Sequence, residues 1–143
     1  MSQIFYADHV EPDAAVQVRS WTGEYAPLHL VPSGLVVLSH LSASELDAYL
    51  GGDLKRTSSR SLTQPSAIRA RLDAVRRQGY SWGFEEFAEG LNSVAAPVLG
   101  PEGSLVATLH VHGPAYRFPK DGDSDAIGLR LSDVCADLAR HLT

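Results

Sequence analysis

The sequence predicts a single domain of the α+β class, in which helices cover a mostly antiparallel sheet. Its 143 residues suffice for one domain with its own hydrophobic core. Pairs of apolar segments with strand-like alternation are joined by short turns, which is typical of antiparallel hairpins. Helical periodicities lie between and after these hairpins, so the expected order is two strands, three helices, three strands and one helix.

Composition limits the possible partners. The chain is 44% hydrophobic and 20% charged, as expected for a soluble globular protein, and its net charge of -5 disfavours direct binding to nucleic acid. The longest apolar run, residues 28–41, contains Pro32, Ser33 and Gly34 and is too short for a membrane span. No secretory signal is evident, and a single cysteine, Cys135, suits a reducing compartment. We therefore expect a cytoplasmic domain that contacts neither membrane nor DNA by itself.

The first half of the chain contains two expected strands and three expected helices. A turn at 11–14 separates the strands, Pro32 enters the first helix, and Ser42 with Glu45 forms a capping box for the second. These elements are strands at 3–10 and 14–21, a loop at 22–29, and helices at 31–41 and 42–52.

The third helix has the clearest pattern. Thr63 is its expected cap, Pro65 lies in its first turn, and Gly79 ends it. Apolar side chains fall on one face and arginines largely on the other, which we interpret as a solvated surface. The buried face is expected to consist of Ile68, Leu72 and Val75.

Three strands and a helix complete the pattern. Strands are expected at 80–86, 92–99 and 104–113, and a helix from about Ser124. The apolar stripe of this last helix is expected to consist of Ile127, Leu131, Val134, Leu138 and Leu142.

Two histidines, His110 and His112, follow the apolar run of the last strand. Taking residues 100–103 as the hairpin turn places Ser93 opposite His110 and Val94 opposite Leu109. Because side chains alternate between faces, the core face would carry one set and the other face a smaller, more polar set. The core set is Val94, Ala96, Val98, Leu105, Ala107, Leu109 and Val111. The polar set is Leu91, Ser93, Ala95, Thr108, His110 and His112.

The histidine pair has several possible roles. A zinc ion would need at least a third protein ligand, and no spacing motif selects one. Ser93 with a histidine could form part of a hydrolase, but neither a nucleophile elbow nor an orienting carboxylate is evident. The remaining interpretations are two hydrogen-bonded histidines on a covered surface, or polar walls of a small-molecule pocket. We expect no cofactor and no metal.

Four stretches resemble the C-terminal effector-binding domain of IclR-type bacterial transcription regulators. They are "APLHLVPSGLVVLSHL", "IRARLDAVRRQGY", "EEFAEGLNSVAAPVLGPEGSLVATL" and "HGPAYRF", which occur in this order from about Phe5 to Leu142. The resemblance implies a GAF-like fold, in which a curved antiparallel sheet carries helices on one face and a ligand pocket on the other.

The resemblance also implies a place in a longer protein. Family members carry an N-terminal winged helix-turn-helix, assemble as dimers or tetramers, and change their affinity for operator DNA when a small metabolite binds. Residues 1–143 would then be a single effector-binding domain, and the C-terminal part of a longer regulator that is not an enzyme. Two alternatives to an effector-binding domain remain. One is a metal- or serine-dependent hydrolase that uses Ser93, His110 and His112, and the other is a dimerisation domain with a vestigial pocket.

The implied pocket involves the loop matching "PLHLVPSG" and the polar face of the hairpin. Relative to common family patterns, histidines replace serines at 110 and 112, and Gly83 replaces a carboxylate. Val31 and Leu35 make the mouth more apolar. These departures favour a small organic acid with an apolar or aromatic body, its carboxylate held by a histidine. The candidate effector-binding residues are Leu28, His29, Val31, Gly34, Leu35, Gly83, Leu91, Ser93, His110 and His112.

Overall fold

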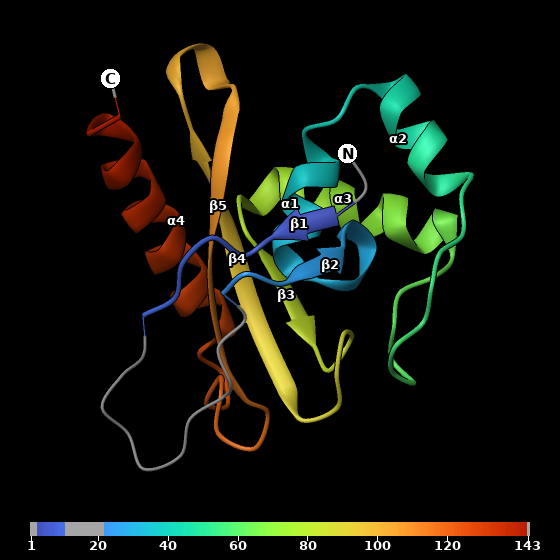
Figure 1. The fold of residues 1–143 in the computed structure, drawn as a ribbon. Helices are drawn as coiled ribbons and strands as arrows, with labels where there is room; N and C mark the ends of the chain where they lie inside the picture. Colours follow the sequence, from blue (N-terminus) through green and yellow to red (C-terminus); the bar gives the residue numbers. More distant parts are fainter. Residues whose placement is uncertain (1–2, 11–21, 143) are drawn as a thin grey trace.

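The computed structural model describes residues 3–10 and 22–142, and Figure 1 shows its fold. The predicted turn at 11–14 and the whole of the second predicted strand, 14–21, lie outside these residues. The first half contains β1 (Gln3–Phe5), β2 (Tyr25–Pro27), the 3₁₀ turn η1 (Leu28–Leu30), α1 (Pro32–Ser39), α2 (Ala43–Leu50) and α3 (Pro65–Gln78). The second half contains β3 (Ser81–Phe84), β4 (Leu91–Leu99), the 3₁₀ turn η2 (Pro101–Gly103), β5 (Leu105–Pro114) and α4 (Ser124–Arg140).

The strands form two antiparallel sheets, which confirms the α+β class. One sheet has three strands in the order β3-β4-β5, and the other pairs β1 with β2. Strand β2 falls where a loop was predicted, because its three residues pair with β1 and Tyr6 N–H donates to the Glu24 carbonyl at 3.0 Å. None of the helices in the described residues is long and apolar enough to cross a membrane.

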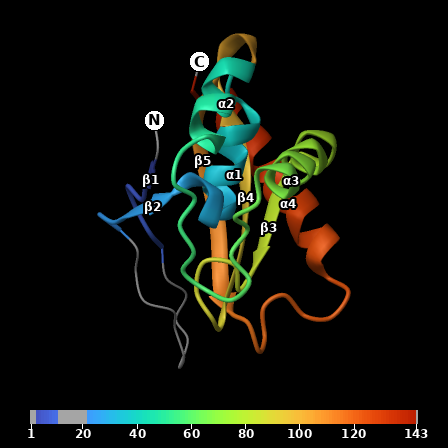
Figure 2. The same cartoon turned by 90° about the vertical axis from the view of Figure 1, so that its right-hand side faces the viewer.

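Helices lie on both faces of the three-stranded sheet (Figures 1 and 2). Helix α4 packs on the face that carries Val94, Ala96 and Val98, where Leu131 and Cys135 complete a buried cluster. Helix α1 packs on the opposite face and in turn contacts α3. The pocket described below shares this second face with α1.

Helix ends follow the predicted chemistry with one exception. The Ser42–Glu45 capping box is present at α2, and Gly79 ends α3 with a left-handed φ of 85°. The prediction of Thr63 as the cap of α3 was wrong. Gln64 occupies the N-cap position without a side-chain hydrogen bond, and Thr63 Oγ1 accepts instead from Arg56 at 3.1 Å.

The predicted stripe of α4 was correct for only part of its length. Leu131 is buried, but Val134, Leu138 and Leu142 are exposed. Their places against the sheet are taken by smaller side chains because the helix approaches β3 and β4 closely. Gly128, Leu131 and Cys135 are the buried residues of α4.

The predicted register of the β4–β5 hairpin was wrong by two residues. Ser93 pairs with His112 and Val94 with Val111, because Leu99 pairs with Leu105 instead of Ser104 at the turn and an irregularity at Val98/Leu99 adds a second residue to β5. A shift of two preserves the side-chain alternation, so Ser93, His110 and His112 still share a face. Leu105 lies beyond the irregularity and packs against the α1 side, not on the predicted core face.

Candidate functional site

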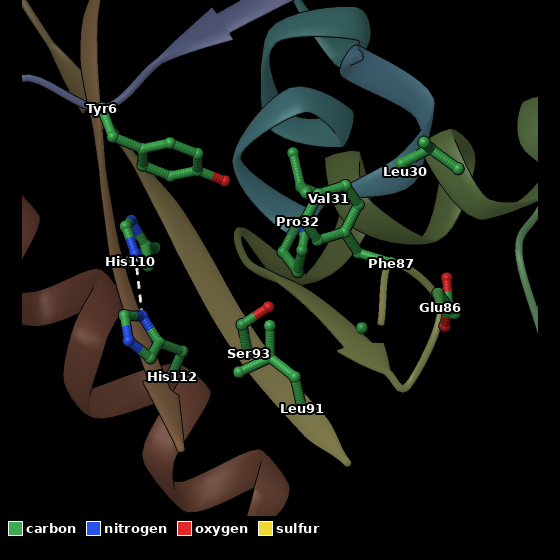
Figure 3. A pocket seen from close by; sticks show the side chains of 11 residues that line it. Tyr6, Leu30, Val31, Pro32, Glu86, Phe87, Leu91, Ser93, His110 and His112 are labelled. Carbon is green, nitrogen blue, oxygen red and sulfur yellow. Dashed lines mark hydrogen bonds between the residues drawn. The ribbon is translucent and has the colours of Figure 1, made fainter. Parts of the chain in front are cut away.

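A small cavity of about 20 Å³ lies between the first turn of α1, the β3–β4 connection and β5 (Figure 3). Five of the side chains that line it are apolar: Leu30, Val31, Pro32, Phe87 and Leu91. The remaining lining residues are Tyr6, Gly83, Glu86, Ser93, His110 and His112.

The sequence positions these residues through short-range features. Proline at the first position of α1 starts that helix at the cavity. Gly83 permits this approach, because a Cβ there would stand 2.9 Å from Pro32 Cγ and 3.9 Å from Ser93 Oγ. Alternation along β4 and β5 brings Ser93 and both histidines to the same face.

His110 and His112 form a hydrogen-bonded pair. His110 Nε2 lies 3.1 Å from His112 Nδ1, and the two rings lie edge to edge, with centroids 5.2 Å apart and planes inclined by 19°. With both rings neutral, one of the two outer nitrogens carries a proton and the other does not. One added proton gives the pair two outward N–H donors, one on each ring, and either of them can donate to a carboxylate.

The surroundings keep this pair neutral in the absence of an anion. Burial lowers the pKa of His110 to about 4, with smaller contributions from His112 and His9. Burial also lowers the pKa of His112, and the neighbouring His9 adds to this effect. A bound anion would reverse this penalty by stabilising the protonated form.

The one carboxylate among the described lining residues is already engaged. Glu86 is buried, and Arg71 Nη1 donates to its Oε1 at 3.0 Å. Its other oxygen lies 3.3 Å from the Phe84 amide. The cavity therefore offers imidazoles to a ligand and holds its own acid in an ion pair.

The N-terminal segment Gln3–Val10 contributes residues that no sequence pattern identifies. The Tyr6 ring meets His110 edge-on at 4.9 Å, and the His9 ring stacks on His112 at 5.4 Å. Burial raises the pKa of Tyr6 to about 12, so it remains a neutral phenol. These contacts join segments a hundred residues apart, which no local periodicity encodes.

Six of the ten predicted effector-binding residues line the cavity, and four do not. Val31, Gly83, Leu91, Ser93, His110 and His112 lie at its walls. Leu28 and Leu35 instead belong to the core formed with α2 and α3. Gly34 faces η1, where a Cβ would stand 2.1 Å from the Leu28 carbonyl oxygen.

His29 is a structural histidine. Its Nε2 lies 2.7 Å from the Lys55 carbonyl, which only accepts, so Nε2 carries the proton. Its Nδ1 then accepts from the Tyr49 hydroxyl at 2.8 Å. Both ring nitrogens are satisfied, and the residue is buried among core side chains instead of lining the cavity.

Neither enzymatic alternative gains support from this geometry. Among the described residues, no group of three His, Cys, Asp or Glu side chains could hold a metal ion. The same residues show no hydrogen bond between Ser93 and either imidazole, although Ser93 pairs with His112 across the hairpin. A serine nucleophile needs such a base in contact.

Comparison with known proteins identifies the family. The sequence profile described as "Bacterial transcriptional regulator IclR C-terminal" matches residues 1–140. The HTH-type transcriptional regulator KdgR of Escherichia coli K12 is 32% identical over 119 residues, which are 82% of this chain and 45% of KdgR. The chain thus spans less than half the length of this curated relative.

Solved structures agree with the sequence match. A transcriptional regulator from Rhodococcus sp. RHA1 superposes with a TM-score of 0.90 at 30% identity, over 99% of this chain and 58% of that one. The PobR inducer-binding domain from Acinetobacter, solved as a double mutant with 3-hydroxybenzoic acid, gives 0.79 at 26% identity, over 89% of this chain and 74% of that one. The chain belongs to the IclR family of bacterial transcriptional regulators and corresponds to their C-terminal effector-binding domain.

Proposed function

We propose that the cavity beside the His110–His112 pair binds a small organic acid as the effector. The carboxylate accepts hydrogen bonds from the singly protonated pair, and the apolar body of the acid lies against Val31, Pro32 and Leu91. The observation that carries this proposal is the imidazole pair, 3.1 Å apart, at an apolar cavity whose carboxylate is held by Arg71. The 3-hydroxybenzoic acid in the related PobR domain is an acid of this class.

The whole regulator would act on DNA through another part of the protein. We propose that a helix-turn-helix segment outside residues 1–143 binds the operator and that effector binding changes its affinity. The net charge of -5 on this chain agrees with such a division, since phosphate binding needs a basic surface. The full-length protein would work in the cytoplasm as a homodimer or homotetramer and would not be an enzyme.

A panel of acids and their neutral analogues tests the binding site. Melting curves would be recorded with benzoate, 3-hydroxybenzoate and short 2-oxo acids, and with the amide of each. A ligand at 100 times its Kd adds about 2.7 kcal/mol to the free energy of unfolding, which raises Tm by several degrees. We expect at least one acid to raise Tm while its amide does not. Equal shifts by acid and amide, or no shift by any acid, would contradict the proposal.

A further inference from the structure

The volume of the cavity is too small for an organic acid. Its volume of about 20 Å³ is enough for roughly one water molecule, whereas small-molecule pockets commonly measure several hundred Å³. An open groove of about 1050 Å³ lies on the other side of the same wall, between the segment Gln3–Val10 and β5. Tyr6, His110 and His112 line both spaces and so separate them. A wall must therefore move before a ligand can enter.

The β3–β4 connection, which forms one wall, is fixed by side chains from another loop. Ser58 Oγ donates to the Glu85 carbonyl at 2.7 Å, and Ser61 Oγ donates to the Glu86 carbonyl at 2.8 Å. Thr57 Oγ1 donates to the Phe87 carbonyl. Three consecutive carbonyl groups are thus held in place, which fixes Phe87 at the cavity.

The N-terminal segment forms the opposite wall and is held differently. Its first half is anchored by three residue pairs with β2 and by Ile4, which packs against two core clusters. The backbone of Tyr6 is also anchored, because its N–H donates to the Glu24 carbonyl at 3.0 Å and its carbonyl accepts from the Gly23 N–H at 2.7 Å. The Tyr6 side chain interacts with Ser33, and the Tyr6 ring contacts His110 as the His9 ring contacts His112. Ring contacts of this kind are weaker than charge-assisted hydrogen bonds, so a carboxylate can replace them.

We propose that the Tyr6 side chain and residues 7–10 form the lid of the effector site and that His9 is a third imidazole ligand of the effector carboxylate. This inference rests on the proposed function. Displacement of the Tyr6 ring from His110 joins the cavity to the groove and creates room for the acid. Reclosure brings His9, which stacks on His112, to the carboxylate already bound by the pair. Asp8 and Arg117 are the other charged residues that line the groove.

The kinetics of binding distinguish the two walls. With 3-hydroxybenzoate as the probe, the observed association rate of the parent protein should reach a plateau at high ligand concentration, because lid opening becomes limiting. Tyr6→Ala should remove the plateau, while Phe87→Ala, the matched removal of an aromatic ring from the fixed wall, should retain it. A plateau that persists in Tyr6→Ala and disappears in Phe87→Ala would overturn the proposal.

The equilibrium affinity tests the role of His9. His9→Ala should weaken 3-hydroxybenzoate binding about tenfold or more, mainly through faster dissociation. His141→Ala is the matched control, because it removes an exposed imidazole that lies after α4 and lines neither space. Equal affinity of His9→Ala and the parent would exclude His9 as a ligand.

A ligand-free measurement separates failure of the lid from failure of the proposed function. NMR titration of the imidazole protons reports the pKa of His110, which burial lowers to about 4. Tyr6→Ala should raise it toward 6.5 because the ring is uncovered, and Tyr116→Ala, which removes an exposed ring that lines neither space, should leave it unchanged. An unchanged pKa in Tyr6→Ala contradicts the lid whether or not any acid binds. If the pKa rises but no acid binds the parent protein, only the proposed function fails.

Discussion

The two faces of the β3-β4-β5 sheet differ in burial and polarity. On the α4 face, Val94, Ala96 and Val98 are almost inaccessible to solvent and pack against Leu131 and Cys135. On the opposite face, α1 covers Ala95 with Val36, while Ser93, His110 and His112 on the same strands remain partly exposed at the cavity.

This difference indicates where the free energy of folding and that of binding arise. Burial of apolar side chains under α4 and α1 stabilises the fold. The histidine pair, in contrast, lies in surroundings that disfavour its charged form, a cost that an anionic ligand would relieve. Substitutions on the α4 face should therefore change stability, and substitutions at the cavity should change binding.

The largest expected effect is on the α4 face, at Gly128. A Cβ at this position would stand 2.4 Å from two carbons of the Tyr80 ring, which is itself buried and donates to Asp125 at 2.9 Å. We expect Gly128→Ala to lower the free energy of unfolding by about 3 kcal/mol or more, because neither the ring nor α4 has space to move. Urea denaturation measures this loss. Gly52→Ala, whose Cβ would meet only the Tyr49 carbonyl at 3.4 Å, is the control and should cost less than about 1 kcal/mol.

Substitution of the histidine pair should weaken binding strongly and change stability little. His110→Ala combined with His112→Ala should weaken binding of the cognate acid at least about 100-fold, since both charge-assisted hydrogen bonds are lost. The same double variant should change the free energy of unfolding at pH 7.5 by less than about 1 kcal/mol. Thr108→Ala, on the same face of β5, is the control. Retained affinity in the double variant, measured by calorimetry, would remove the basis for the site.

Acid should destabilise the protein through His110. Its pKa is about 4 in the folded state and about 6.5 in an unfolded chain, so the unfolded chain binds more protons between these values. The free energy of unfolding should fall by about 2 kcal/mol as pH decreases from 6.5 to 4, and should gain nothing from this group above 6.5. The facing titratable groups are His112, His9 and Tyr6.

Comparison with a variant isolates this contribution from other acidic titrations. His110→Asn should lose about 2 kcal/mol less than the parent protein over the same pH range, as measured by urea denaturation at pH 7 and pH 4. If the free energy of unfolding fell by the same amount in both proteins, His110 would have the same pKa in the folded and unfolded states.

The smallest effect should come from Gly83, the glycine on the cavity face. Its Cβ would stand 2.9 Å from Pro32 Cγ, an atom of a ring at the start of α1. We expect Gly83→Ala to cost about 1 kcal/mol, less than Gly128→Ala, and to weaken acid binding by shifting Pro32 into the cavity. A stability loss as large as that of Gly128→Ala would mean that both faces are packed equally tightly.

Periodicity predicted the faces of the sheet better than its register. The alternation along residues 91–113 placed Ser93, His110 and His112 together, and an error of two residues did not change that assignment. One residue of the error arose at the turn, where Leu99 pairs with Leu105, and the other at Val98/Leu99, where the strand becomes irregular. Such irregularities depend on the local backbone, here with Glu102 at a φ of 63°, and apolar patterning does not encode them.

The loop before α1 was harder to predict than the hairpin. "PLHLVPSG" places Leu30, Val31 and Pro32 at the cavity, although only Val31 of these was named as a binding residue, and Leu28 faces the core. Tyr6, Glu86 and Phe87 line the cavity from outside this loop without having been predicted. They come from separate segments, and only tertiary packing brings these together.

Proton uptake on binding tests most directly whether the histidine pair acts as a singly protonated carboxylate site. Both imidazoles have lowered pKa values in the free protein, so at pH 7 the pair is neutral. Calorimetric titration with the cognate acid in two buffers of different ionisation enthalpy measures the protons taken up. We predict an uptake approaching one proton per acid bound, with affinity that weakens as pH rises above 7. Tight binding without proton uptake, and equally tight at pH 6 and pH 8, would contradict this account.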